Sequence, residues 1–305
     1  MVMVEGVVDE RRPRVAARLN RLRRRRDGRA PLWFELAVMA WLFWLYDVIN
    51  DLAPTRRALA LANAHAMLSL ERSLGVDIEL TLNRWLNAHS VLAFIATYDY
   101  FFAHVIVTFA MLALLWWRQP ALYRRMRTRL VIVNLIAFAI FWRYPLAPPR
   151  MLPGLGYADV VADSHAVISW HSGALVHDAD QFAAMPSLHI AWAMWSSMAA
   201  WRLFRTRIVA ALAICYPLLT AFTVLATGNH YVLDVLAGAV TLLTAVGLEV
   251  LLQRARARLA LGRRVPVKLA AARCGMRSRA RAGLAHASAQ QAGADGAVQR
   301  SSGPT

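Results

Sequence analysis

The amino-acid sequence predicts an all-α, polytopic membrane protein with six transmembrane helices and both termini in the cytoplasm. Of its 305 residues, 58% are hydrophobic, yet the formal net charge is +17. The two properties are separated along the chain, because long apolar runs alternate with short arginine clusters, as is typical of membrane proteins. A nucleic-acid-binding domain would carry its basic residues on a folded soluble face. Here the arginines flank the apolar runs, which argues against nucleic acid as a partner.

Six apolar segments have roughly the ~20 residues that a bilayer core requires. They fall at 31–50, 91–117, 130–145, 185–204, 208–227 and 230–252. With six crossings, 29 of the 35 Lys and Arg residues lie on one side of the membrane. The positive-inside rule makes that side the cytoplasm.

The same pattern predicts how the chain is divided. We expect a basic cytoplasmic arm at 1–30, a six-helix membrane domain with the candidate catalytic residues at 31–252, and a basic, disordered cytoplasmic tail at 253–305. The first outer link, 55–89, reads as amphipathic helices at the membrane interface. The second, 146–184, reads as a loop. The N-terminus does not resemble a cleavable signal peptide, because the apolar run after its long basic stretch has spanning length and no cleavage site.

No metal centre is predicted. Cys215 lies in an apolar run and Cys274 in the tail, which suggests neither a disulfide framework nor a metal cluster. The outer loop contains several further candidate ligands, but their spacing fits no familiar ligand pattern and favours a solvated loop. These residues are Asp163, His165, His171, His177, Asp178 and Asp180.

Three polar clusters are expected at the same membrane face. The third segment ends outside with "RYPLAPPRM", the fourth begins outside with "PSLH", and the sixth begins outside with "GNHYVLDVLAG". Chance would scatter such clusters over both faces, so their coincidence indicates a site.

His230 and Asp234 are four residues apart and therefore share one face of a helix. The carboxylate can accept a hydrogen bond from one imidazole nitrogen and leave the other nitrogen basic, an arrangement suited to covalent catalysis. The alternative is a structural polar pair between two helices, although ionisable groups in membrane segments are usually functional.

In "PSLH", Pro186 suits the first position of a helix. The backbone N–H groups that follow, including that of Ser187, would then point outward and form an anion site. His189 lies close enough to give a proton to a bound anion. The alternative is an ordinary helix start.

Arg143 and Arg150 bracket the prolines of "YPLAPP". Two guanidinium groups near a helix N-terminus suit a tetrahedral oxyanion, whereas either one alone could simply reach the lipid headgroups. Taken together, a nucleophile, its orienting carboxylate, a proton donor and a cationic clamp predict phosphoryl transfer through a phosphohistidine.

These residues resemble the type-2 phosphatidic acid phosphatase superfamily, which shares its site with vanadium haloperoxidases. The family signature is Lys-x6-Arg-Pro, then Pro-Ser-Gly-His, then Ser-Arg-x5-His-x3-Asp. The chain has matching spacings in the same order over roughly 90–250. The resemblance implies His230 as the nucleophile, Asp234 as its partner and His189 as the proton donor. It also implies a phosphate site formed by Arg143, Arg150 and Ser187, and no metal or other cofactor.

The chain departs from the signature at several positions. Arg143 replaces lysine, Met151 replaces proline and Leu188 replaces glycine. The Ser-Arg pair reads Thr223-Val224, so one phosphate-binding arginine is missing, and Asn229 is a candidate neutral donor in its place.

"PSLH", "LSLERSLGVDIE" and "YDYFFAH" look like the branch that contains inositol phosphorylceramide synthases. In that branch Asp99 and His104 would line a headgroup or acceptor pocket, although a buried hydrogen-bonded pair explains them equally well.

The expected function is that of a lipid-phosphate phosphotransferase at the outer face of the cytoplasmic membrane. It would move a phosphoryl group or an inositol phosphate-like headgroup from a donor lipid to a lipid hydroxyl. One alternative is a lipid phosphate phosphatase, in which water is the acceptor. Two further alternatives are an anion transporter and an inactive lipid-binding homologue. The missing phosphate-binding arginine supports the second of these.

Overall fold

The computed structural model describes residues 31–51, 56–163 and 182–259, with only the backbone for 49–51. Within these ranges the chain is helical, and its β-structure is limited to an isolated bridge between Leu146 and Ala183. The predicted all-α class is confirmed. The chain divides into two compact units, Met1–Glu249 and Val250–Thr305, and the candidate site described below lies in the first.

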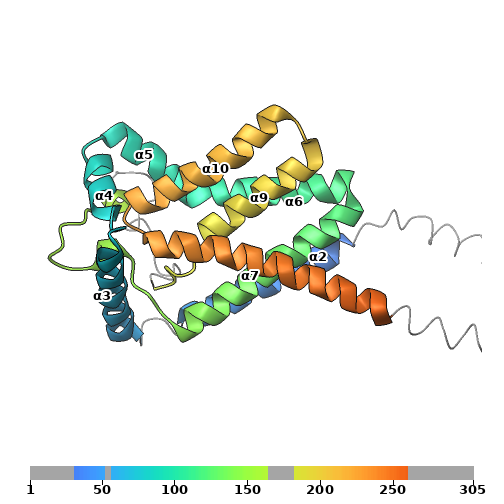
Figure 1. The fold of residues 1–305 in the computed structure, drawn as a ribbon, viewed down its shortest axis with the longest axis horizontal. Helices are drawn as coiled ribbons and strands as arrows, with labels where there is room; N and C mark the ends of the chain where they lie inside the picture. Colours follow the sequence, from blue (N-terminus) through green and yellow to red (C-terminus); the bar gives the residue numbers. More distant parts are fainter. Residues whose placement is uncertain (1–30, 52–55, 164–181, 260–305) are drawn as a thin grey trace, which may run out of the picture. The chain divides into compact units, whose positions relative to one another are not determined.

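The described helices follow the apolar segments and the first outer link. They are α2 (Leu32–Asp51), α3 (Arg57–Leu74), α4 (Glu79–Asn87), α5 (Ser90–Tyr98), η2 (Asp99–Ala103), α6 (His104–Arg118), α7 (Pro120–Arg143), η3 (Pro149–Met151), α8 (Val160–Asp163), α9 (Leu188–Phe204) and α10 (Arg207–Ala226). A last helix spans Val232–Leu259. Helices α2, α6, α7, α9 and α10 are held together by pairwise contacts (Figure 1).

Three helices are long and apolar enough to cross a membrane: Ser90–Arg118, which joins α5, η2 and α6, then Arg207–Ala226, and Val232–Leu259. They correspond to the second, fifth and sixth predicted segments. The fourth segment forms α9, which has 17 residues, fewer than the ~20 of a full crossing. Six crossings and cytoplasmic termini therefore stay predictions.

Large apolar side chains are exposed along α10, which is the surface expected of a helix that faces lipid. They include Ile208, Leu212, Ile214, Leu218 and Leu219.

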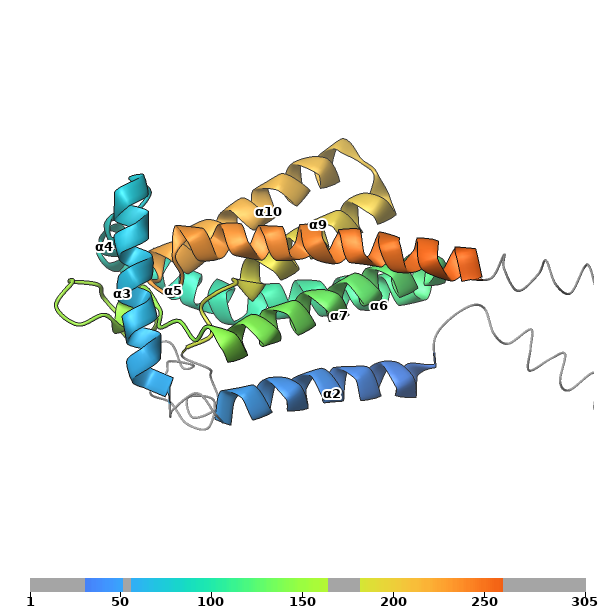
Figure 2. The ribbon, with the colours of Figure 1, turned by 60° about the horizontal axis from the view of Figure 1, so that its bottom comes forward.

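The first outer link forms the two helices α3 and α4, which lie beyond the ends of the longer helices (Figure 2). Gly75 ends α3 in the left-handed region with φ 69°, a conformation that favours glycine. One face of α3 is buried, including Ala60, Ala64 and Met67. This face packs against Leu146 and Tyr231, so the link covers the end of the bundle where the three polar motifs lie.

The main core of the bundle surrounds Trp195 of α9. Its indole ring is fully buried among side chains of α6, α7 and the last helix. The indole Nε1–H donates to the backbone carbonyl of Met126 at 2.8 Å, which satisfies the polar end of this large side chain.

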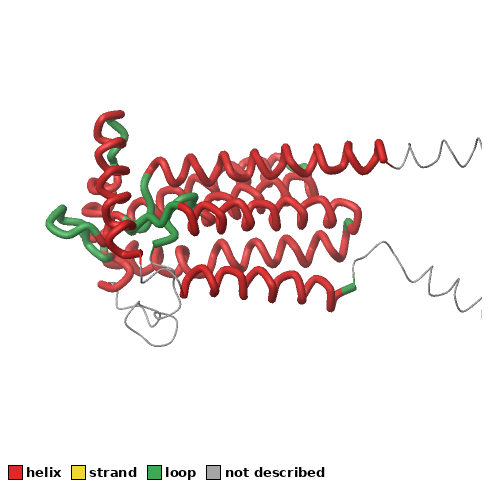
Figure 3. The backbone as a smooth tube through the Cα atoms, turned by 90° about the horizontal axis from the view of Figure 1, so that it is seen from below, coloured by secondary structure: helices red, strands yellow, loops and turns green. Residues whose placement is uncertain are grey.

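The tube in Figure 3 shows the long helices running alongside one another.

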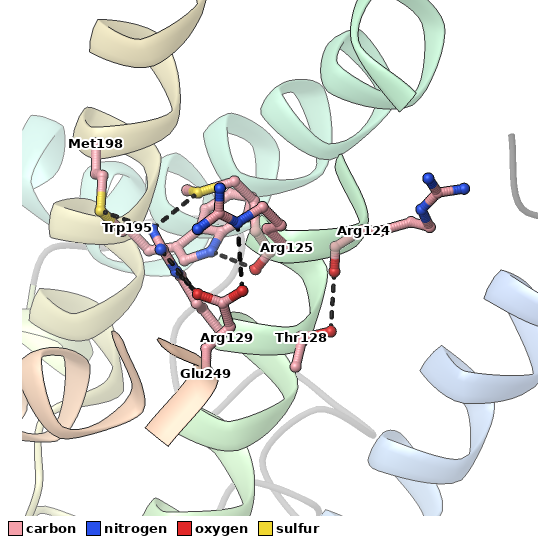
Figure 4. Close-up of polar contacts among 8 residues, drawn as sticks. Arg124, Arg125, Thr128, Arg129, Trp195, Met198 and Glu249 are labelled. Carbon is pink, nitrogen blue, oxygen red and sulfur yellow. Dashed lines mark hydrogen bonds and ion pairs between the residues drawn. The ribbon is translucent and has the colours of Figure 1, made fainter. Parts of the chain in front are cut away.

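A buried ion pair ties α7 to the last helix. Arg129 Nη2 lies 2.9 Å from Glu249 Oε2, and their side chains are only 3% and 2% exposed. Arg125 also reaches Glu249, with its Nε 3.4 Å from Oε1, but its side chain is 44% exposed. Figure 4 shows both guanidinium groups directed at this carboxylate, whereas Arg124 points away.

We predict that Arg129→Ala costs about 3–5 kcal/mol of stability, because it leaves a carboxylate buried without its main partner. Arg125→Ala is the matched control. Arg125 contacts the same carboxylate but is more exposed, so its loss should lower the free energy of unfolding by at most about 1 kcal/mol. Unfolding of the purified variants in detergent measures both. Equal losses would contradict a specific role for the buried pair.

Candidate active site

The turn between α10 and the last helix fixes the backbone of His230. Gly228 has φ 71°, and a Cβ atom there would lie 3.1 Å from Asn83 Nδ2 and 3.4 Å from Arg150 Cβ. The backbone N–H groups of Asn229 and His230 both donate to the carbonyl of Val224 at 3.2 Å. The left-handed conformation and the close approach both require glycine.

His230 lies between the other two residues of the predicted catalytic set. Its Nδ1 is 3.5 Å from Asp234 Oδ2, and its Nε2 is 3.3 Å from His189 Nδ1. The histidine–carboxylate distance is longer than a good hydrogen bond. The structure thus brings together the three residues that the sequence predicts as a catalytic set.

The gap between the two imidazole nitrogens is too small for a phosphate in line between them. A hydrogen bond from one nitrogen to a leaving oxygen alone takes about 2.7 Å, which nearly fills the observed 3.3 Å. In-line attack on a phosphorus centre between these two nitrogens would therefore require the imidazole rings to move apart.

The start of α9 is held against the last helix. The backbone N–H of Ser187 donates to the carbonyl of Asp234 at 3.1 Å, and a Cβ atom on Gly238 would lie 2.4 Å from the carbonyl oxygen of Ser187. Glycine at 238 thus lets the segments that carry His189 and His230 meet.

This contact corrects one expectation for "PSLH". The helix begins at Leu188, with Ser187 as its N-cap, so Pro186 precedes the helix instead of occupying its first position. The N–H of Ser187 is used by Asp234 and cannot bind an anion. Its Oγ is buried and has no hydrogen-bond partner among the described residues.

The two predicted clamp arginines lie in different environments. Arg150 lines the cavity next to His189 and His230. Its Nε donates to Asn229 Oδ1 at 2.7 Å, and its Nη1 lies 3.1 Å from Asp159 Oδ2. Arg143, in the last turn of α7, is exposed and is not part of the cavity wall. The structure therefore brings only Arg150 to the histidines.

Asn229 contributes to the same wall, but its amide nitrogen donates to Thr227 Oγ1 at 3.0 Å while its oxygen holds Arg150. Its visible contacts are those of a residue that orients the guanidinium.

A short π-helix, η2, places two further rings beside His189. The ring of Tyr100 stacks on that of His189 with centroids 4.5 Å apart, and the ring of His104 lies at 4.2 Å. Short π-helical segments within α-helices are frequent at functional sites. His104 lines the cavity. Asp99 is not part of the cavity wall. Its carboxylate instead accepts a hydrogen bond from Thr223 Oγ1 at 2.9 Å.

The cavity has a volume of about 310 Å³ and joins the polar site to an apolar space. Its polar end includes Arg150, His189 and His230. Its apolar walls come from α2, α6, α7 and α9 and include Leu42, Phe43, Phe109, Leu130, Phe138 and Trp192. Such a cavity fits a ligand with a charged head and an apolar body.

Within the described residues, no group of three or more His, Cys, Asp or Glu side chains is placed to hold a metal ion. Asp163 ends α8. The other loop residues considered as ligands, His165, His171, His177, Asp178 and Asp180, lie outside the described residues.

We predict that Gly238→Ala destabilises the protein by about 1–3 kcal/mol, because the added methyl group collides with backbone and forces α9 away. It should also slow any reaction that uses His189 and His230 together. Gly247→Ala in the same helix is the control, since a Cβ atom there meets nothing within 4 Å. Alanine has the higher helix propensity, so that variant should be neutral or more stable. Equal thermal unfolding midpoints for the two variants would contradict the close contact.

Comparison with protein families gives one match. A family model described as the PAP2 superfamily matches residues 65–248, a range that contains α9, α10, His230 and Asp234. No curated protein and no solved structure matches the chain.

Proposed function

Since the chain belongs to the PAP2 superfamily, we propose that it is a membrane enzyme that transfers a phosphorylated headgroup from a donor lipid through a covalent bond to His230. The observation that carries this proposal is the placement of His230 in the cavity wall, with Asp234 on one side and His189 on the other. This is the arrangement of an activated nucleophile with an orienting carboxylate and a proton donor.

The reaction takes place in two displacements. Asp234 holds the proton on Nδ1 of His230, which leaves Nε2 with a lone pair. Nε2 attacks phosphorus, the bond from phosphorus to the lipid oxygen breaks, and His189 gives that oxygen a proton. In the second step His189 takes a proton from an acceptor hydroxyl, whose oxygen attacks phosphorus and releases His230.

The charge of the site favours a phosphodiester donor over a phosphomonoester. Arg150 is the guanidinium that the described cavity wall contributes, and it already shares its charge with Asp159 at 3.1 Å. Val224 stands where the family signature has its second phosphate-binding arginine. A diester carries one negative charge and a monoester close to two at neutral pH, so a site with little net positive charge suits the diester.

The apolar part of the cavity supports a lipid as the donor. Side chains of α2 and α7 enclose it next to the polar end, so an acyl or prenyl chain can lie there while its phosphate meets His230. Burial of each CH₂ group contributes about 0.8 kcal/mol to binding.

His230→Ala should reduce turnover to background, because it removes the proposed nucleophile. His189→Ala should slow the first displacement by about 10²–10⁴-fold through loss of the proton donor. His65→Ala, at an exposed position on α3, is the control and should be unchanged. The assay uses purified protein in detergent with phosphatidylinositol or phosphatidic acid, with and without a ceramide or diacylglycerol acceptor.

Donor labelled at phosphorus should leave an acid-labile, base-stable label on His230 when the reaction is quenched rapidly. Product that appears only with the lipid acceptor establishes transfer, whereas release of water-soluble phosphate without it establishes hydrolysis. Absence of both label and product for every donor would support the transporter or the inactive lipid-binding homologue.

The arginine distribution supports an active site on the extracytoplasmic side of the inner membrane. A cysteine introduced as His165→Cys, in a chain with Cys215 and Cys274 replaced by Ala, should then react in intact cells with a reagent that does not cross membranes. A cysteine at Arg258 is the control and should react only after permeabilisation. The reverse pattern would overturn this topology.

A further inference from the structure

Two glutamates that the proposed reaction does not use are completely buried at the base of the site. Glu71 lies near the end of α3 and Glu79 begins α4. Both are 0% exposed. Burial of a carboxylate is costly unless it is hydrogen-bonded or neutralised, so two such groups side by side require an explanation.

Both carboxyl groups bind the first turn of the last helix. Glu79 Oε1 accepts from the backbone N–H of Val232 at 2.8 Å, and Glu71 Oε1 accepts from that of Leu233 at 2.8 Å. Asp234 Oδ2 accepts from the N–H of Tyr231 at 3.0 Å. Three consecutive amides directly after His230 are therefore taken by three carboxyl groups. The first N–H groups of a helix have no partner within the helix and carry partial positive charge, so this capping stabilises its start.

The second oxygens of the two glutamates favour a proton shared by the pair. Oε2 of each is buried and meets no N–H or O–H donor among the described residues. A proton on one glutamate supplies that donor, because it can bond to the other. Burial raises the pKa of Glu71 to about 8, opposed by the bond from Leu233 and assisted by the charge of Glu79. Burial raises the pKa of Glu79 as well.

The groups that face the pair from neighbouring elements are mostly acidic or neutral. Asp77 precedes α4, Asp234 and Tyr231 lie at the start of the last helix, and Tyr157 lies in the loop after η3. Arg72 is the nearby cation, but it pairs with Asp77 at 3.6 Å and is half exposed. These surroundings favour a proton over a cation as the group that neutralises the pair.

We propose that Glu71 and Glu79 are positioning residues that share one proton and together hold the helix start that carries His230 and Asp234. The effect of this pair on catalysis rests on the proposed function, whereas its effect on the stability of the helix start does not. The singly protonated pair caps two amides with one net charge, whereas the doubly ionised pair places two adjacent charges in a buried space, which weakens the capped turn.

The direction of the pH effect follows from the shift of Glu71. Its pKa in the fold, about 8, lies above the ordinary value of 4.5. The folded protein thus holds more protons than the unfolded chain between these two values, and stability falls as the pH rises through this window. The stability that the shifted pKa of Glu71 contributes is fully present below pH 4.5 and is lost once the pH passes about 8.

The test compares Glu71→Gln, Glu71→Ala and Asp77→Asn in detergent between pH 5.5 and 9.5. Glutamine keeps an oxygen for the N–H of Leu233 and a donor for Glu79, but it does not titrate. In the wild-type protein, both kcat and the thermal unfolding midpoint should fall as the pH rises through about 8. Glu71→Gln should retain wild-type kcat at pH 6.5 and should not show this alkaline fall. Glu71→Ala should lose about 10²-fold in kcat at every pH, as expected for a displaced nucleophile. Asp77→Asn removes an exposed acid of the same link and should keep the alkaline fall.

An infrared pH-difference spectrum gives a readout that does not need turnover. Wild-type protein should show the C=O band of a buried protonated carboxyl group that disappears between pH 7 and 9, and Glu71→Gln should lack that band. A wild-type pH dependence of both band and midpoint in Glu71→Gln would overturn this proposal and leave the proposed function intact. A normal infrared result with no phosphoryl transfer would overturn the function and leave the structural role of the pair intact.

Discussion

The arrangement of the site depends on the capped first turn of the last helix. The amides of Tyr231, Val232 and Leu233 are held by carboxyl groups, and the candidate catalytic residues are placed relative to this turn. His230 comes directly before it and Asp234 lies within it. One turn later, Gly238 lets α9 approach closely enough for Ser187 to bond the backbone of Asp234. A single fixed helix start therefore sets the relative positions of three segments that are far apart in the sequence.

Much of this site could be predicted from the sequence, because its residues follow local helical rules. The spacing of His230 and Asp234 places them on one helix face, and the positions of the motifs at the ends of apolar segments indicate a common face. In the structure, His189, His230 and Arg150 line one cavity. The all-α class followed equally directly from the apolar segments.

The remaining features depend on tertiary contacts that no local pattern encodes. Glu71 and Glu79 lie in an amphipathic link, where acids at helical spacing are usually solvated, and only the fold buries them. Tyr100 faces His189 because the π-helix changes the register of the helix there. Arg143 and Arg150 have the family spacing, but α7 ends at Arg143 and the chain then turns, so only Arg150 reaches the cavity. Asp159 as the partner of Arg150 could not be foreseen either.

For the proposed lipid phosphotransferase, the contact between the imidazole rings of His189 and His230, with Nδ1 and Nε2 3.3 Å apart, has a consequence for substrate selection. Separating the two rings costs free energy, and a small soluble phosphate makes few contacts that could offset this cost. A lipid can use the interaction of its chain, far from phosphorus, to drive the rings apart, which is the use of remote binding energy to reach a reactive geometry. Discrimination against the abundant phosphates of the surrounding water would then arise from the hydrocarbon chain, although the chain takes no part in the chemistry.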